Sequence, residues 1–151
     1  MFRGVNIISL DAKGRFAMPT RYREQLDESC SGKLIVTVDR DHCLLIYPFP
    51  EWEEIERKLV KLPSFNRQAR GMQRLLIGHA TELDMDANGR MLLTPPLRKF
   101  AALEKRAVLI GQGNKFELWD EQTWNQKCEQ WFDEGELDAD GLPPELESLS
   151  L

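Results

Sequence analysis

The sequence predicts a mainly β fold with helices, of the α+β class, in which two tandem units form one pseudo-twofold barrel. Three observations predict it. The chain of 151 residues contains the motif Asp-Ala-Xaa-Gly-Arg twice, at 11–15 and again at 86–90. Short apolar runs of strand length surround each copy, and an amphipathic helix pattern closes each unit. Because a unit of about 50 residues buries too little surface to be stable alone, we expect the two copies to pack together.

The repeat extends well beyond this motif. One offset aligns five pairs: Asp11 with Asp86, Ala12 with Ala87, Gly14 with Gly89, Arg15 with Arg90, and Arg23 with Arg98. After a net loss of three residues from the second copy, Val36 aligns with Val108 and Trp52 with Trp124. The duplication therefore covers most of each half.

Each unit begins with a pair of short strands and a helix. Apolar runs at 5–10 and 15–18 flank the turn-forming Asp-Ala-Lys-Gly, which predicts a hairpin or a bulged strand–loop–strand. Gly14 and Gly89 supply the backbone freedom that such a loop needs. The stretch "PTRYREQL" then predicts a short helix, because proline suits a first helical position.

Each unit ends with two further strands and an amphipathic helix. The strands are "KLIVTVD" and "CLLIYPF" in the first copy and "RAVLIGQ" and "KFELWD" in the second. The helices are "PEWEEIERKLVKL" and "DEQTWNQKCEQWF". We expect a first unit at 5–52, a second at 81–124, linking helices at 53–80, and a helix end with an acidic tail at 125–151.

The distribution of charge favours an anionic partner. The formal net charge is -5, yet residues 1–75 carry 13 Lys/Arg against 10 Asp/Glu, whereas residues 133–151 carry seven acids and no Lys or Arg. Five cations lie within the first 23 residues, against Asp11 alone. One end of the first unit is therefore locally cationic, although such a cluster is also typical of an ordinary solvated surface.

Other classes of protein find little support. No apolar run approaches the ~18 residues of a membrane span, and the opening residues do not form a signal peptide, so we expect a cytoplasmic protein. The three cysteines have neither disulfide nor zinc spacing and are expected to be buried or partly buried thiols. We find no catalytic constellation and expect no enzyme, cofactor, metal or small-molecule ligand.

Several stretches carry a resemblance to a known family. "LDAKGRFAMPTRYREQL" resembles the swapped-hairpin motif of the SpoVT/AbrB class of DNA-binding proteins. Its duplication and the opening "MFRG" resemble the MraZ family over essentially the whole chain, including "RLLIGHATELDMDANGR" and "GNKFELWDEQTW". This resemblance implies a double-split β-barrel of two AbrB-like units. The second copy departs from the motif, because Thr94-Pro95-Pro96 stands where the first has Pro19-Thr20-Arg21, and its loop has fewer cations.

The resemblance also implies a function. Members of this family are bacterial transcriptional regulators of the cytoplasm and nucleoid that assemble as rings. They bind short G-rich direct repeats upstream of the division and cell-wall gene cluster and typically repress it, including their own gene. Their Asp-Xaa-Xaa-Xaa-Arg motifs lie on the DNA-facing surface. The DNA-binding residues expected here are Arg15, Lys13, Arg3, Asp11, Arg90 and Asp86.

Chemistry assigns these side chains different tasks. The fork of Arg15 can donate two hydrogen bonds to guanine O6 and N7, and this is the expected base reader. Lys13 and Arg3 suit phosphate oxygens. Asp11 either holds the Arg15 guanidinium or pairs with an arginine across a subunit boundary, and both alternatives stay open. The simpler interpretation is that Asp11–Arg15 and Asp86–Arg90 are ordinary loop salt bridges. The occurrence of the motif in both copies argues against it.

Two hypotheses remain beside this one. The basic loops of an antitoxin-like or adaptor protein would bind an acidic protein partner instead of DNA. The acidic tail is most simply a solvated segment, and a sharper hypothesis is that it screens the basic face and repels non-specific DNA.

Overall fold

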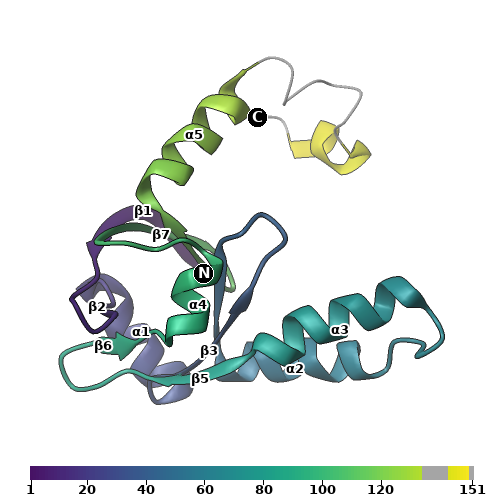
Figure 1. Cartoon of the computed structure of the whole chain (residues 1–151), viewed down its shortest axis with the longest axis horizontal. Helices are drawn as coiled ribbons and strands as arrows, with labels where there is room; N and C mark the ends of the chain where they lie inside the picture. Colours follow the sequence, from purple (N-terminus) through teal and green to yellow (C-terminus); the bar gives the residue numbers. More distant parts are fainter. Residues whose placement is uncertain (134–142, 150–151) are drawn as a thin grey trace. The chain divides into compact units, whose positions relative to one another are not determined.

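Eight β-strands form two antiparallel sheets in the computed structural model, which describes residues 1–133 and 143–149 (Figure 1). The strands are β1 (Phe2–Ser9), β2 (Arg15–Ala17), β3 (Lys33–Val38), β4 (Leu44–Pro48), β5 (Thr81–Asp84), β6 (Arg90–Leu92), β7 (Arg106–Gly113) and β8 (Phe116–Asp120). The larger sheet has the order β1-β7-β8-β4-β3-β5, and β2 pairs with β6 in a separate two-stranded ribbon.

The described residues include five α-helices, two of which are the closing helices that the sequence predicts. They are α1 (Thr20–Cys30), α2 (Phe49–Val60), α3 (Arg67–His79), α4 (Pro95–Phe100) and α5 (Glu121–Phe132), and a short 3₁₀ helix, η2, covers Pro144–Leu149. Within the described residues, no helix is long and apolar enough to cross a membrane. The chain divides into two compact units, Met1–Glu121 and Gln122–Leu151.

The strand pairing gives the compact unit Met1–Glu121 a pseudo-twofold axis. β1 of the first half pairs with β7 of the second, and β5 of the second half pairs with β3 of the first. Equivalent residues lie directly opposite each other where the halves meet: Phe16 opposite Met91 in the ribbon, and Leu45 opposite Glu117 between β4 and β8. The halves therefore exchange strands rather than stand side by side as separate domains.

The predicted fold class is confirmed as α+β. The strands lie in a six-stranded sheet and a two-stranded ribbon, and hydrogen bonding among the described strands does not continue around a closed barrel. The domain boundaries predicted from the repeat stay predictions, because both halves contribute strands to both sheets.

The register corrects the alignment of one strand pair. Ile8 lies opposite Ala107, whereas its repeat equivalent Leu83 lies opposite Leu34. Leu34 and Ala107 are therefore equivalent positions, and the alignment of this strand predicted from the sequence is wrong by one residue.

The physical reason is that these strands are buried on both faces. Val36 corresponds to Leu109 and not to Val108, and all three side chains are buried. A strand without alternation of polar and apolar residues does not indicate its own register.

The main core lies between the ribbon and the six-stranded sheet. Phe16 and Met91 point inward from the ribbon and are each 2% exposed. Helices α1 and α4 contribute Leu26 and Leu97 to the same cluster. Apolar contacts with both halves of the chain therefore hold the ribbon against the six-stranded sheet.

Helices α2 and α3 cover the other face of the first half. Side chains alternate along β3, so Thr37 points away from the main core. Its hydroxyl donates to the carbonyl oxygen of Leu76 on α3 at 2.6 Å. Gln73 on α3 donates to the carbonyl oxygen of Leu59 on α2 at 2.7 Å, which ties the two helices together.

The cysteines and tryptophans take ordinary structural positions. Cys43 is buried, and burial raises the pKa of its thiol. Cys30 and Cys128 are partly buried, as predicted. Trp52 is 2% exposed, and its indole N–H donates to Glu56 at 2.8 Å.

Candidate nucleic-acid interface

The two Asp-Xaa-Xaa-Xaa-Arg loops have the same backbone geometry. Asp11 Oδ1 accepts from the backbone N–H groups of Lys13 and Arg15, each at 2.9 Å. Asp86 Oδ1 accepts in the same way from the backbone N–H groups of Asn88, at 2.9 Å, and Arg90, at 2.8 Å. Each aspartate therefore shapes its own loop, which is the local reason that this residue type stands at this position.

The aspartates are held in the charged form. The backbone N–H of Arg15 is the largest influence on Asp11 and lowers the pKa of that carboxyl below its usual 3.8. The backbone N–H of Arg90 likewise lowers the pKa of Asp86. A carboxyl whose pKa is lower in the folded state stabilises the fold at pH values above its unfolded-state pKa. This stabilisation is lost as the pH falls through the folded-state pKa. Both aspartates therefore stay charged down to a lower pH than an ordinary aspartate does.

We expect Asp11 to retain a depressed pKa in an Arg15→Ala variant. The backbone N–H at position 15 is the largest single cause of the lowered pKa, and both it and the backbone N–H of Lys13 survive the substitution. A ¹³C NMR titration of the carboxyl should therefore show a midpoint below 3.8 in both proteins. Return of the variant to the ordinary aspartate value would mean that the side-chain ion pair dominates instead.

The ribbon presents two arginines on its outer face. Arg15, Ala17, Arg90 and Leu92 are exposed, and they alternate with the buried Phe16 and Met91. Arg15 lies opposite Leu92, and Arg90 lies opposite Ala17. The arginines are thus diagonal neighbours, at about 7–8 Å for Cα atoms in such a ladder. Arg15, Arg90 and Asp11 all line one open hollow of about 410 Å³.

The two loops differ in charge. Arg15 Nε donates to Asp11 Oδ2 at 2.7 Å, and both side chains are about two-fifths exposed. The ion pairs among residues 1–133 include no equivalent between Asp86 and Arg90. The first loop carries Lys13 where the second carries the neutral Asn88. The pseudo-twofold symmetry of the backbone is therefore broken in the side chains.

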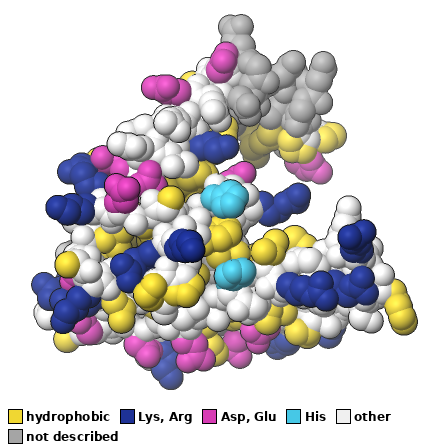
Figure 2. Space-filling view, in the orientation of Figure 1, with side chains coloured by type: hydrophobic (Ala, Val, Ile, Leu, Met, Phe, Trp, Pro, Cys, Tyr) yellow, Lys and Arg dark blue, Asp and Glu magenta, His cyan; other side chains and the backbone are white. Residues whose placement is uncertain are grey.

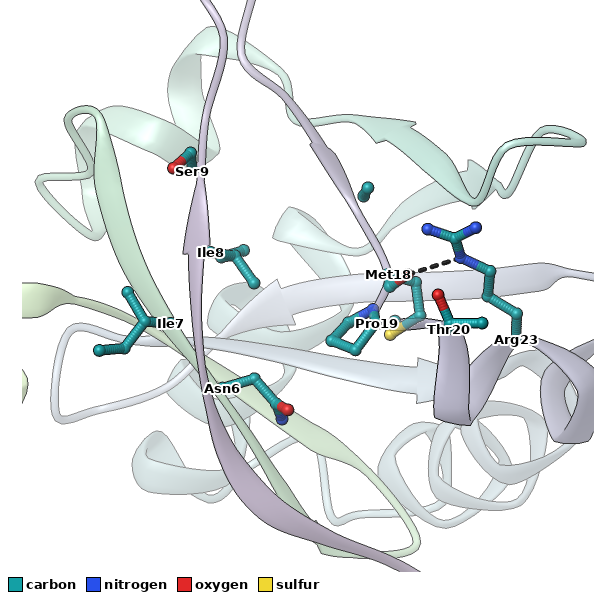
Figure 3. Close-up of a pocket in the computed structure, with 9 residues that line it drawn as sticks. Asn6, Ile7, Ile8, Ser9, Met18, Pro19, Thr20 and Arg23 are labelled. Carbon is teal, nitrogen blue, oxygen red and sulfur yellow. Dashed lines mark hydrogen bonds between the residues drawn. The ribbon is translucent and has the colours of Figure 1, made fainter.

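One arginine on α1 and one on α4 contact both loops. Arg23 Nε donates to the carbonyl oxygen of Met18 at 2.7 Å (Figure 3), and Arg98 Nε donates to the equivalent Leu93 at 3.2 Å. Each guanidinium also lies against the glycine of the opposite half's loop, Arg23 against Gly89 and Arg98 against Gly14.

Backbone hydrogen bonds cross between the halves at the same place. Met18 N–H donates to the carbonyl oxygen of Gly89 at 2.8 Å, and Leu93 N–H donates to that of Gly14 at 3.0 Å. Each loop is therefore completed by the other half of the chain.

Gly14→Ala is expected to destabilise the first unit. Gly14 has φ +88°, and a Cβ there would meet the Arg98 Nε at 2.5 Å. Left-handed backbone at a non-glycine residue costs about 1–3 kcal/mol, and displacement of the guanidinium adds to it. Denaturant unfolding should show a loss of at least about 1 kcal/mol.

Gly71→Ala is the matched control. Gly71 lies in α3 with open space around it, so the same change should stabilise the protein by about 0.5–1 kcal/mol. Equal effects of the two substitutions would contradict the tight packing of Arg98 on the loop.

The structure places Arg3 apart from the other predicted residues. Arg3 lies near the start of β1, whereas the loop follows the end of that strand. Ser9 lies six residues farther along the strand, about 20 Å away at 3.3 Å per residue. Arg15, Arg90 and both loop aspartates are brought together, and Arg3 belongs to a different part of the surface.

Sequence reasoning aligned Arg23 with Arg98 but assigned them no role. The available signal was their repetition at the same offset as Gly14 and Gly89, against which they pack. Leu92, which is 52% exposed on the same face of the ribbon as Arg15 and Arg90, gave no signal, because a single exposed leucine is ordinary.

Strand exchange between the two halves, with paired arginine loops on a shared ribbon, defines a duplicated, strand-swapped domain. The family model described as "MraZ protein, putative antitoxin-like" matches residues 1–75 and again residues 76–141. The chain belongs to the MraZ family, a family of transcriptional regulators and not of enzymes.

Individual relatives are similar to this chain over its full length. A Thioalkalivibrio sulfidiphilus protein named transcriptional regulator MraZ is 59% identical over 151 residues, with both chains covered completely. Proteins of the same name from Methylococcus capsulatus and Pseudomonas aeruginosa are 58% and 56% identical, with 99% and 100% of each chain covered.

Proposed function

We propose that this chain is a sequence-specific DNA-binding transcriptional regulator that acts on the nucleoid in the cytoplasm. It binds short G-rich direct repeats as a ring oligomer and represses the division and cell-wall gene cluster, including its own gene. The observation that carries the proposal is the exposed ribbon, which presents Arg15 and Arg90 as diagonal neighbours on one face.

The dimensions and chemistry of the ribbon suit a DNA groove. The major groove of B-DNA admits a two-stranded β-ribbon, and an arginine fork there pairs with guanine O6 and N7. Asp11 restrains the Arg15 guanidinium at 2.7 Å, which reduces the entropy that binding would otherwise cost. Lys13 in the adjacent loop suits a phosphate oxygen, which positions the ribbon without reading sequence.

The broken symmetry of the ribbon favours direct repeats. A protein with true twofold symmetry matches a palindromic site, since each half reads the same sequence on opposite strands. Here Lys13 and Asn88 give the two loops unequal charge. The ribbon therefore has a direction on DNA, and sites repeated head to tail fit it.

A ring supplies the affinity that one ribbon lacks. Several linked ribbons raise affinity by about 10²–10⁴ without new contacts. Two similar but unequal halves suit a heterologous contact that closes into a ring. Val5 and Ile7 on the edge strand β1 are each 61% exposed and provide apolar surface for self-association.

Fluorescence anisotropy tests this function. Labelled DNA from upstream of the protein's own gene is compared with a scrambled duplex at several salt concentrations. We expect the native sequence to be preferred at every salt concentration, with both affinities falling as salt rises. Equal, weak binding to both duplexes would contradict sequence-specific recognition.

Deletion of residues 133–151 is expected to raise affinity for random DNA. This segment carries seven acids and no Lys or Arg, so its removal takes negative charge away from the protein. The effect should shrink as salt screens the repulsion. Unchanged affinity of the shortened protein for scrambled DNA at low salt would remove the idea.

The printed family description favours one second candidate. It includes the words "antitoxin-like", and the basic loops of such a protein would bind an acidic protein partner. The two functions differ in geometry, because base reading needs the fork of Arg15 whereas attraction to an acidic surface needs only its charge. Arg15→Lys should therefore abolish DNA preference but largely preserve binding to an acidic protein.

A further inference from the structure

A surface around α3 combines cations with exposed apolar side chains. Residues 60–81 include four cations, Lys61, Arg67, Arg70 and Arg74, and contain no aspartate or glutamate. Figure 2 shows lysine and arginine side chains gathered along the helical hairpin that α2 and α3 form. We call residues 60–81, with the hollow described below, the α3 surface.

The arginines of α3 are not explained by the stability of the helix. Its first turn contains no acid, and Arg67 and Arg70 lie at the end where the helix dipole is positive. Cations there are unfavourable, because they face the positive end of the helix dipole. The ion pairs found within residues 1–133 use none of the three α3 arginines. An anionic partner would offset this unfavourable arrangement.

A mainly apolar hollow of about 350 Å³ lies against α3, and the charged residues Asp39 and Arg40 also line it. Met72, Leu75 and Phe100 line it, and the first two are 37% and 43% exposed. Phe100 is held by the His42 ring, which stacks on it at 5.0 Å between centroids. Phe65, near the end of the turn between α2 and α3, is 96% exposed. Nucleic acid does not require such apolar surface, whereas an amphipathic peptide does.

One segment of this chain has the complementary chemistry. Residues 133–151 carry seven acids and no cation, and the last ten residues include four leucines. Within η2, Leu146 and Leu149 are three residues apart and therefore lie on the same side of a 3₁₀ helix. Leu149 is 54% exposed, so this apolar edge is available to a partner.

We propose that the α3 surface binds the acidic, leucine-containing segment 143–151 of a second copy of this chain. Leu146 and Leu149 enter the hollow beside Leu75, and Glu145 faces the α3 arginines. This is the helix-in-groove mode, in which apolar anchors supply affinity and the charges set orientation.

The choice of a second copy rests on the ring assembly of the proposed function. Every copy carries one such surface and one such segment, so exchange between neighbours leaves neither unfilled in a closed assembly. Neighbouring subunits also hold the segment at a high effective concentration.

A labelled peptide tests the surface independently of DNA and of the ring. A fluorescein-labelled peptide of residues 141–151 is titrated into full-length protein that carries Leu146→Ser and Leu149→Ser, so that the protein's own segment does not compete. We expect saturable binding that weakens with salt. Leu75→Ser in the same background should reduce affinity at least about tenfold, because the variant loses a leucine side chain that becomes buried on binding.

Leu92→Ser is the matched control, since Leu92 is an exposed leucine on the ribbon, and it should leave peptide affinity unchanged. Absence of peptide binding, or an equal loss with both substitutions, would overturn the proposal. Loss of DNA affinity without loss of peptide affinity in Arg70→Ala and Arg74→Ala would also overturn it and assign the surface to DNA.

Crosslinking between copies tests the source of the segment. An untagged protein with a photoreactive phenylalanine analogue at position 149 is mixed with an affinity-tagged protein that lacks the probe. Crosslinks to α3 of the tagged chain support the proposal, and crosslinks confined to the probe's own chain overturn it. Mass photometry of the same mixture reports ring assembly separately, so failure of the ring and failure of the docking site are distinguished.

Discussion

Arg15→Ala is expected to abolish the preference for the native upstream DNA while leaving the fold and assembly intact. The Arg15 side chain is 43% exposed and contacts only Asp11 as an ion-pair partner, so little of the core depends on it. Loss of one bidentate guanine contact costs about 1–3 kcal/mol of discrimination, or roughly 5- to 150-fold for each ribbon. In a multivalent assembly the loss recurs at every repeat. Anisotropy with native and scrambled duplexes measures it.

Arg57→Ala is the matched control for charge. Arg57 lies on α2 in an exposed ion pair with Glu54, so its removal changes the net charge by the same amount at a different surface. It should lower affinity for both duplexes slightly and equally, if at all. A similar loss of preference in Arg57→Ala would mean that net charge, and not the Arg15 fork, determines the discrimination.

Arg90→Ala asks whether the second loop also reads bases. Without the tight ion pair seen in the first loop, the Arg90 guanidinium is less restrained before binding, and its fork is expected to contribute less. A smaller loss of preference than that of Arg15→Ala fits the unequal loops. An equal loss would show that the ribbon reads symmetrically despite its unequal charge.

Phe16→Ala is expected to have the largest effect on stability. Phe16 is 2% exposed beneath the ribbon and lies opposite its repeat equivalent Met91 on the pseudo-twofold axis. Truncation of a buried phenylalanine costs about 3–5 kcal/mol. At roughly 2–4 °C for each kcal/mol in a chain of this size, the melting temperature should fall by about 10 °C.

Phe65→Ala makes the same chemical change at a residue that is 96% exposed, and it should leave the melting temperature nearly unchanged. Calorimetry of the two variants checks the contrast. If Phe16→Ala melted within about 2 °C of the wild type, the ribbon would not depend on this core contact.

Most elements were predictable from local patterns. The turn chemistry of Asp-Ala-Lys-Gly with Gly14 placed the first loop, and both closing helices follow from apolar spacing, with α2 at Phe49–Val60 and α5 at Glu121–Phe132. The motif also located Arg15 and Arg90, because duplication of an Asp-Xaa-Xaa-Xaa-Arg loop demands a common reason.

Contacts between the halves were not predictable in the same way. A strand run such as β3 is apolar on both faces, so its sequence does not specify the partner or the register. The contact of Arg98 with Gly14 joins residues far apart in the chain, and no local pattern encodes such a pair. Arg3 shares its charge with the loop cations, but charge alone carries no information about position along a strand.

The crossed hydrogen bonds between Met18 and Gly89 and between Leu93 and Gly14 limit how the two copies can diverge. A change in either glycine disturbs the arginine of the other half, and both copies carry glycine at this position. Position 13 and its counterpart 88 point to solvent from the same loops, and there the copies have become lysine and asparagine. A change of an exposed loop side chain is thereby independent of the other half, whereas a change of either loop glycine affects both halves together.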